Sequence, residues 1–108
     1  MRVLAAILLA LLAFAVPATA SSQESTSYNA QVIRHVFGRN GADAVRVAWC
    51  ESRLHVWSTN GQYWGLFQMG SFARQKYGHA WNAWAESRAA YRYFKDAGGW
   101  GPWSCRPQ

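Results

Sequence analysis

The chain has 108 residues, a formal net charge of +6 at pH 7 and seven tryptophans. Its length favours a single domain, and its cationic residues are scattered rather than clustered, so no nucleic-acid partner is indicated. A basic surface suits a secreted protein that meets an anionic cell wall, but it equally suits a protein that is merely well solvated.

Residues 1–20 have the form of a secretory signal peptide: a short basic start, an apolar run and an Ala-Thr-Ala cleavage site. The apolar run is shorter than the ~20 residues that span a bilayer, so we expect no stable membrane insertion after cleavage. The sequence therefore predicts a secreted, extracellular or cell-wall-associated protein. Residues 21–28 are polar and are expected to form a flexible lead-in, and residues 29–108 are expected to form the domain.

Four stretches have the apolar periodicity of helices, with a capping residue before them or a glycine after them. They are residues 29–37 with Asn29 as cap, about 42–52, 71–77 with Ser71 as cap, and 83–97 with Asn82 as cap. Between the second and third stretches, β-branched and aromatic residues flank Asn60-Gly61, which is a strong short-range signal of a β-hairpin. The predicted fold class is mainly α, with one short hairpin.

The chain contains two cysteines, Cys50 and Cys105. In a secreted protein they should pair, and a loop of that length stabilises the fold by roughly 4 kcal/mol in the chain-entropy model. The bond would also fix the backbone beside Glu51. Two cysteines and three histidines without ligand spacing do not suggest a metal site, so we expect neither metal nor cofactor.

Glu51 lies on the apolar side of its predicted helix. At 100° per residue, Asp43 and Arg46 share a charged arc, whereas Glu51 follows Val47 and Ala48 by one turn. Loss of hydration raises the pKa of a carboxyl group, which allows a glutamate to donate a proton near neutral pH. A glutamate that finds a hydrogen bond at a helix end is the ordinary alternative.

The density of tryptophan suggests a carbohydrate ligand. Sugar rings have apolar faces and polar edges, and the indole ring matches them with a flat surface and one polar group. Any one tryptophan more commonly fills a core. Trp57 and Trp64, which flank the predicted hairpin turn, are the better candidates for a glycan-binding cleft.

Two runs in the middle of the chain resemble motifs of a known family. Residues 50–52 (Cys-Glu-Ser) and 60–68 (NGQYWGLFQ) are similar to the first two motifs of soluble lytic transglycosylases, whose lysozyme-like fold is shared with the resuscitation-promoting factors. A cysteine before the glutamate, with a partner near the C-terminus, is similar to the latter group. The resemblance covers residues 43–105, although the Ala-Tyr-Asn-Ala-Gly stretch of the larger transglycosylases is missing.

The resemblance implies roles for individual residues. Glu51 would donate a proton to the glycosidic oxygen between N-acetylmuramic acid and N-acetylglucosamine. Gln68 would hydrogen-bond the substrate nearby, with the backbone of Gly65 and Leu66 close to the sugar. Tyr63, within the second motif, and Tyr91, in competition with Tyr93, are further substrate-binding candidates, beside Trp57 and Trp64 from the hairpin. The expected partner is the glycan strand of peptidoglycan, bound by a monomer.

The distribution of carboxylates bears on the reaction. Lysozyme-type hydrolysis uses two carboxylates, yet no Asp or Glu occurs between Ser52 and Ala85. A single glutamate suffices if it first gives and then takes a proton while the muramyl C6 hydroxyl closes a 1,6-anhydro ring. This favours a lytic transglycosylase; a muramidase that uses Glu86 as its second carboxylate, or a non-catalytic peptidoglycan-binding module, are the alternatives.

Overall fold

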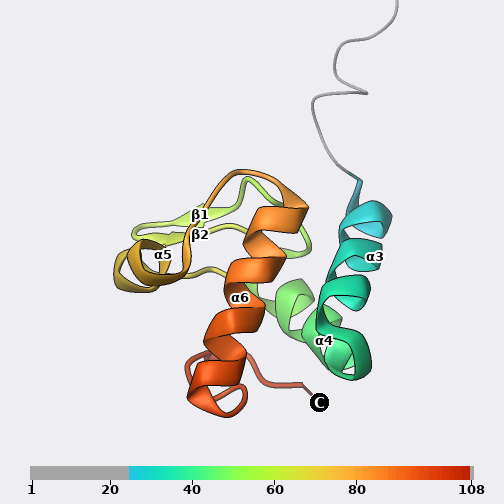
Figure 1. Cartoon of the computed structure of the whole chain (residues 1–108). Coiled ribbons are helices and arrows are strands. Elements are labelled where there is room, and N and C mark those ends of the chain that lie inside the picture. The colour runs from blue at the N-terminus through green and yellow to red at the C-terminus, as the bar shows by residue number, and fades with distance from the viewer. Residues whose placement is uncertain (1–24, 108) are drawn as a thin grey trace, which may run out of the picture.

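A computed structural model describes residues 25–107, which form a mainly helical domain with one hairpin and one disulfide, as predicted (Figure 1). The elements in chain order are α3 (Thr26–Phe37), the short 3-10 helix η1 (Gly38–Asn40), α4 (Gly41–Ser52), β1 (Thr59–Asn60), β2 (Tyr63–Trp64), α5 (Ser71–Tyr77) and α6 (Ala83–Ala97). Within this described part, no helix is both long and apolar enough to cross a bilayer. The predicted signal peptide and the lead-in before Ser25 lie outside it.

Helix α3 begins earlier than predicted. The Ser25 hydroxyl caps it by accepting a hydrogen bond from the Tyr28 amide at 3.1 Å. Asn29 is fully buried inside the helix, and its amide nitrogen donates to the Leu54 carbonyl at 2.9 Å. The predictions that Asn29 is the cap and that residues 26–28 belong to a flexible lead-in are therefore wrong. In the sequence, a buried asparagine that links two segments looks the same as an N-cap asparagine, because both stand next to an apolar helical pattern.

The core joins α3 to α6 and to the chain that follows α6. α3 packs against both α4 and α6, and α5 packs against α6. The fully buried ring of Phe37 lies 5.4 Å from Phe67, 5.1 Å from Tyr91 and 5.6 Å from Trp100, measured between ring centroids. Such clusters of offset and edge-on rings add to the stabilisation that burial gives.

The hairpin forms at Asn60-Gly61, as predicted. Thr59 pairs with Trp64, and Asn60 pairs with Tyr63. Gly61 has φ +61°, a value that glycine adopts without steric cost. Because successive residues of a strand point to opposite faces, Asn60 and Tyr63 share one face of the hairpin while Thr59 and Trp64 share the other.

The start of α5 differs from the prediction. Gly70 occupies the N-cap position, and Ser71 is the first helical residue rather than the cap. The Gln62 side-chain oxygen accepts from the Ser71 amide at 3.0 Å and lies 3.1 Å from its hydroxyl. The hairpin turn thus supplies an acceptor that a helix start requires. The last helix is capped by Asn82 as predicted, through a 2.9 Å hydrogen bond from the Ala85 amide.

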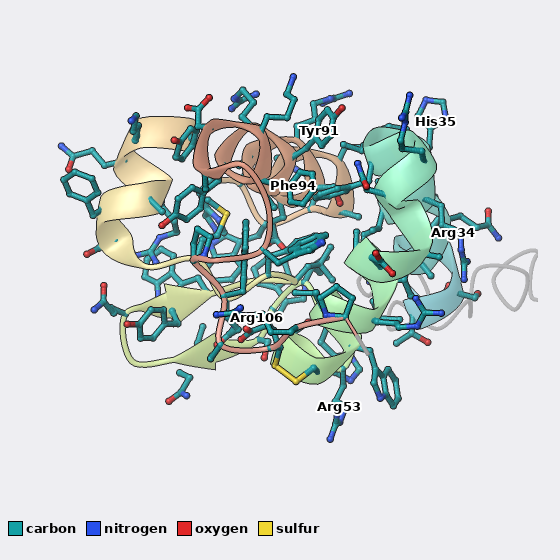
Figure 2. The ribbon with its side chains drawn as sticks, turned by 90° about the horizontal axis from the view of Figure 1, so that it is seen from below. Arg34, His35, Arg53, Tyr91, Phe94 and Arg106 are labelled. Atoms are coloured by element: carbon teal, nitrogen blue, oxygen red, sulfur yellow. A yellow bond between two sulfur atoms is a disulfide. The ribbon has the colours of Figure 1, made fainter. Side chains whose placement is uncertain are left out.

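The C-terminal tail, residues 98–107, returns across the domain to α4. Cys50 and Cys105 form the predicted disulfide. The buried Trp103 ring donates its indole N–H to the Phe67 carbonyl at 2.9 Å, and Arg106 Nε donates to the Trp103 carbonyl at 2.9 Å. In the view from below, Arg106 lies along this crossing segment (Figure 2).

A candidate active-site cleft at the end of α4

A cavity of about 400 Å³ lies beside the C-terminal end of α4. Its lining comes from three separate parts of the chain: Glu51 of α4, Asn60, Tyr63 and Gln68 of the hairpin region, and Pro102, Trp103 and Ser104 of the tail. The structure thus brings together three of the predicted site residues, Glu51, Tyr63 and Gln68. That the tail forms one wall of this cavity was not predicted from the sequence, although the aromatic residues and the cysteine of the tail indicated that it packs against the domain.

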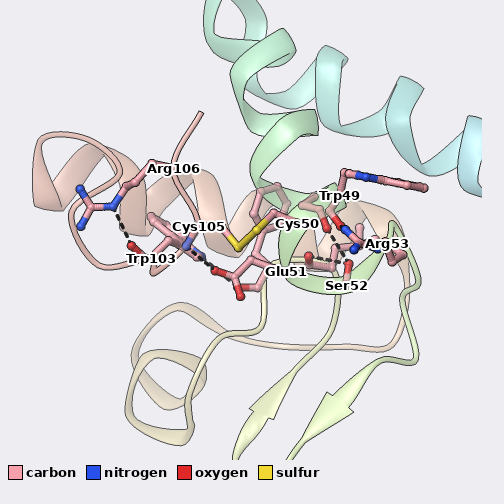
Figure 3. Close-up of a disulfide and its surroundings, with 11 residues drawn as sticks. Trp49, Cys50, Glu51, Ser52, Arg53, Trp103, Cys105 and Arg106 are labelled. Carbon is pink, nitrogen blue, oxygen red and sulfur yellow. Dashed lines mark hydrogen bonds between the residues drawn. A yellow bond between two sulfur atoms is a disulfide. The ribbon is translucent and has the colours of Figure 1, made fainter. Parts of the chain in front are cut away.

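Glu51 is half-buried in the last turn of α4. Burial raises the pKa of its carboxyl group above the ordinary value, and a hydrogen bond from the Cys105 amide to Oε2, at 3.2 Å, offsets part of this rise (Figure 3). The direction agrees with the prediction from the helix face. The disulfide ties the donor of that hydrogen bond to the residue beside Glu51, so the tail and the acid are held together covalently.

The other carboxylates of residues 25–107 are engaged elsewhere. Asp43 forms a surface ion pair with Arg46 at 2.8 Å, and Asp96 accepts a hydrogen bond from the Tyr77 hydroxyl at 2.8 Å. Glu86 is buried and accepts from the Leu66 amide at 2.8 Å. Of the carboxylates in this described part of the chain, Glu51 alone lines the cavity.

The Gly65–Leu66 segment is clamped between two helices. The Leu66 amide donates to Glu86 on α6, while the Leu66 carbonyl lies 2.8 Å from the Ser52 hydroxyl on α4. Gly65 has φ +84°, and a Cβ atom there would lie 2.7 Å from the Glu86 carboxyl carbon. Glycine is therefore required at this position.

The clamp engages the backbone of Gly65 and Leu66, which the resemblance places close to the sugar. Both residues are buried and neither lines the cavity. The Gly65 amide donates to the Ser58 carbonyl at 2.7 Å, and the Leu66 amide is taken by Glu86. These hydrogen bonds hold the loop in place, and a contact of Gly65 or Leu66 with a sugar stays a prediction.

Gln68 follows the clamped segment and lines the cavity. Its side-chain nitrogen donates both hydrogens to backbone carbonyls, of Ser58 at 3.1 Å and of Gly65 at 2.9 Å. Only its side-chain oxygen can therefore accept from a ligand. Gln68 has φ +48°, a conformation that is uncommon outside glycine and that tends to occur at functional sites.

The other predicted substrate-binding residues, Trp57, Trp64 and Tyr91, do not line this cavity, and their contact with a glycan stays a prediction. Trp64 faces away because it alternates with Tyr63 along β2. Trp57 stacks on Trp81 outside the cavity. Tyr91 packs on Phe37, and in Figure 2 it lies on the opposite side of the domain from Arg53 and the disulfide. Spacing along the sequence could not reveal these orientations.

Within residues 25–107 no three His, Cys, Asp or Glu side chains gather in an arrangement that could hold a metal ion. Comparisons of the chain with family models, with curated protein sequences and with solved structures gave no match. The likeness to lytic transglycosylases therefore rests on the motifs in residues 50–52 and 60–68.

Proposed function

We propose that the protein is a secreted peptidoglycan-cleaving enzyme, a lytic transglycosylase that cuts the bond between N-acetylmuramic acid and N-acetylglucosamine. Glu51 is its single catalytic acid and base. The observation that carries the proposal is that, within residues 25–107, Glu51 is the one carboxylate lining the cleft, and burial raises its pKa. A raised pKa keeps a larger fraction of the group protonated near neutral pH, as a proton donor requires.

The reaction needs two proton transfers at the same residue. Protonated Glu51 gives its proton to the glycosidic oxygen as the bond from the muramyl C1 to that oxygen breaks. The muramyl C6 hydroxyl then attacks C1, and its proton passes to the Glu51 carboxylate, which returns the enzyme to its starting state. The products are a 1,6-anhydro-muramyl end and a free N-acetylglucosamine hydroxyl, and no water is consumed. Each transfer is ordinary general acid–base catalysis.

The lining of the cleft suits a sugar chain. Tyr63 is 46% exposed and offers a ring with a polar tip. Asn60 and the Gln68 side-chain oxygen supply polar groups for hydroxyl and acetamido substituents. A retaining two-carboxylate hydrolase would need a second carboxylate about 5–5.5 Å from the acid, and Glu86 is instead bonded to the Leu66 amide.

The test is mass spectrometry of the fragments released from purified peptidoglycan by the protein and by a Glu51→Gln variant. We expect anhydro-muramyl ends from the unaltered protein and a loss of release of about 100-fold or more in the variant. Glu86→Gln is the matched control, because it makes the same change at a carboxylate outside the cleft; its loss should stay below tenfold.

Three results would contradict the proposal. Reducing muramyl ends that disappear with Glu51→Gln would identify a muramidase. Release that survives Glu51→Gln would remove Glu51 from the chemistry. Retained binding without any release would identify a non-catalytic wall-binding module.

A further inference from the structure

Four side chains form a continuous stack beside the hairpin. The rings of Trp57 and Trp81 lie 5.1 Å apart with an interplanar angle of 15°, and those of Trp81 and Trp64 lie 5.1 Å apart at 28°. The guanidinium carbon of Arg74 lies 3.7 Å from the Trp64 ring centroid. The stack begins with a side chain that is 55% exposed, Trp57, and ends at Arg74.

This aromatic stack is separate from the cleft. Tyr63 lines the cavity, and its neighbour Trp64 points to the opposite face of β2. Trp81 comes from the connection between α5 and α6, so the stack joins the hairpin region to that connection. The hairpin therefore carries the cleft on one face and the aromatic stack on the other.

Two polar side chains, Arg74 and His79, contact the rings of the stack. Arg74 donates hydrogen bonds to the carbonyls of Gln62 and Met69. His79 meets Trp81 edge-on at 4.5 Å, and burial, together with the charge of Arg74, lowers the pKa of its imidazole. The imidazole is therefore mainly neutral at pH 7, and the exposed end of the stack is an apolar, uncharged ring held firmly from behind.

We propose that the exposed indole of Trp57, backed by Trp81 and Trp64, is a second glycan-binding site, which takes a sugar ring of a peptidoglycan strand outside the cleft. A flat ring already fixed by stacking loses little conformational freedom when a sugar covers it. The assignment of the glycan as peptidoglycan rests on the proposed function. A second contact on the same polymer would raise the local concentration of strands at the cleft.

The chemistry of the stack favours a glycan over a nucleic acid. Single-stranded nucleic acids also stack on tryptophan, but they require cations along the backbone path. Arg74 lies at the far end of the stack and is held by two carbonyls. A neutral ligand with an apolar face fits such a surface better than a phosphate chain does.

The first experiment follows tryptophan indole N–H signals by NMR in the Glu51→Gln protein, titrated with the N-acetylglucosamine tetramer. Three rings serve as reporters: Trp57 for the stack, Trp103 for the cleft, and Trp49, which is 51% exposed on α4, as the matched control. We expect the Trp57 signal to shift along a saturable curve while Trp49 stays unchanged.

The second experiment measures binding of the same protein to insoluble peptidoglycan. In the Glu51→Gln background, Trp57→Ala should weaken binding about 3- to 10-fold, whereas Trp49→Ala should leave it unchanged. If Trp57→Ala does not fold, the NMR titration of the Glu51→Gln protein alone tests the proposal.

Several results would overturn the proposal: a Trp57 signal that does not move at saturation, a Trp49 signal that moves equally, or equal binding by both alanine variants. A single-stranded oligonucleotide that shifts Trp57 at lower concentration than the tetramer would also overturn it. If the proposed function is wrong but the second site exists, peptidoglycan is not cleaved while the Trp57 signal still shifts on addition of the sugar.

Discussion

Two glutamates at two helix ends show how the surroundings assign different tasks to the same side chain. Glu51, in the last turn of α4, is half-buried, borders the cavity and receives one hydrogen bond at 3.2 Å. Glu86, in the first turn of α6, is 4% exposed and accepts the Leu66 amide at 2.8 Å. The Glu51 carboxyl group therefore remains accessible to a ligand, whereas the Glu86 carboxyl group fixes the loop that contains Leu66.

Glu86 also constrains which residue the loop can carry at position 65. Glu86 occupies the space that a side chain on Gly65 would need. On the other side of Leu66, the Ser52 hydroxyl donates a hydrogen bond to the Leu66 carbonyl. Ser52, which is next to Glu51, and Glu86 therefore hold the two peptide groups that flank Leu66, two residues before Gln68 of the cavity lining.

The largest effect on stability is expected from the disulfide. Replacing both Cys50 and Cys105 by serine opens a loop with a sequence separation of 55 residues and should lower the free energy of unfolding by about 4 kcal/mol. Urea unfolding, monitored by tryptophan fluorescence, measures this directly. Release of the tail should also expose Glu51 to water, so the pKa of the Glu51 carboxyl group should fall towards the ordinary value of 4.5. A variant that unfolds at the same urea concentration as the parent would refute the tail's role.

A smaller effect separates the two glutamates. Glu86→Ala leaves the buried Leu66 amide without its acceptor and should cost about 2–4 kcal/mol of stability. Glu51→Ala should change stability by less than about 1 kcal/mol. Glu86→Gln, which keeps an oxygen for the Leu66 amide, should recover much of the loss. If thermal unfolding shows that the two alanine variants are equally destabilised, Glu86 does not have the structural role assigned to it.

The smallest effect is a pH dependence at Glu51. Because burial raises its folded-state pKa, protonation of Glu51 favours the folded state. That contribution is present below the unfolded pKa and is lost as pH rises through the folded pKa. Glu51→Gln should therefore raise the melting temperature at neutral pH, by a few degrees at most, and the gain should shrink below about pH 4.5. A melting-temperature gain that grows as the pH falls would contradict a raised pKa of Glu51.

Local patterns in the sequence were sufficient for much of the fold. The apolar periodicity and Asn82 predict α6, and Asn60-Gly61 predicts the hairpin. Two cysteines in a chain with a predicted leader indicate the disulfide. The partial burial of Glu51 follows from its angular position on the helix, since helical geometry alone sets that position.

Contacts between distant segments could not be predicted in this way. Asn29 and Ser71 both have the local form of caps, but burial against Leu54 and the reach of Gln62 decide their roles. The turn of residues 98–107 back to α4 makes the second wall of the cleft. The placement of Trp57 outside the cleft depends on its stacking with Trp81, which is 24 positions away in the sequence.

The most direct test of the single-carboxylate account is digestion of peptidoglycan in water enriched in oxygen-18. If the C6 hydroxyl closes onto C1 with Glu51 as the only acid and base, no solvent oxygen enters the sugar, and the new muramyl ends should carry no label. Both glycosidase mechanisms that use water would place solvent oxygen at C1. Unlabelled anhydro ends that vanish with Glu51→Gln are the predicted result, and labelled reducing ends would contradict the account.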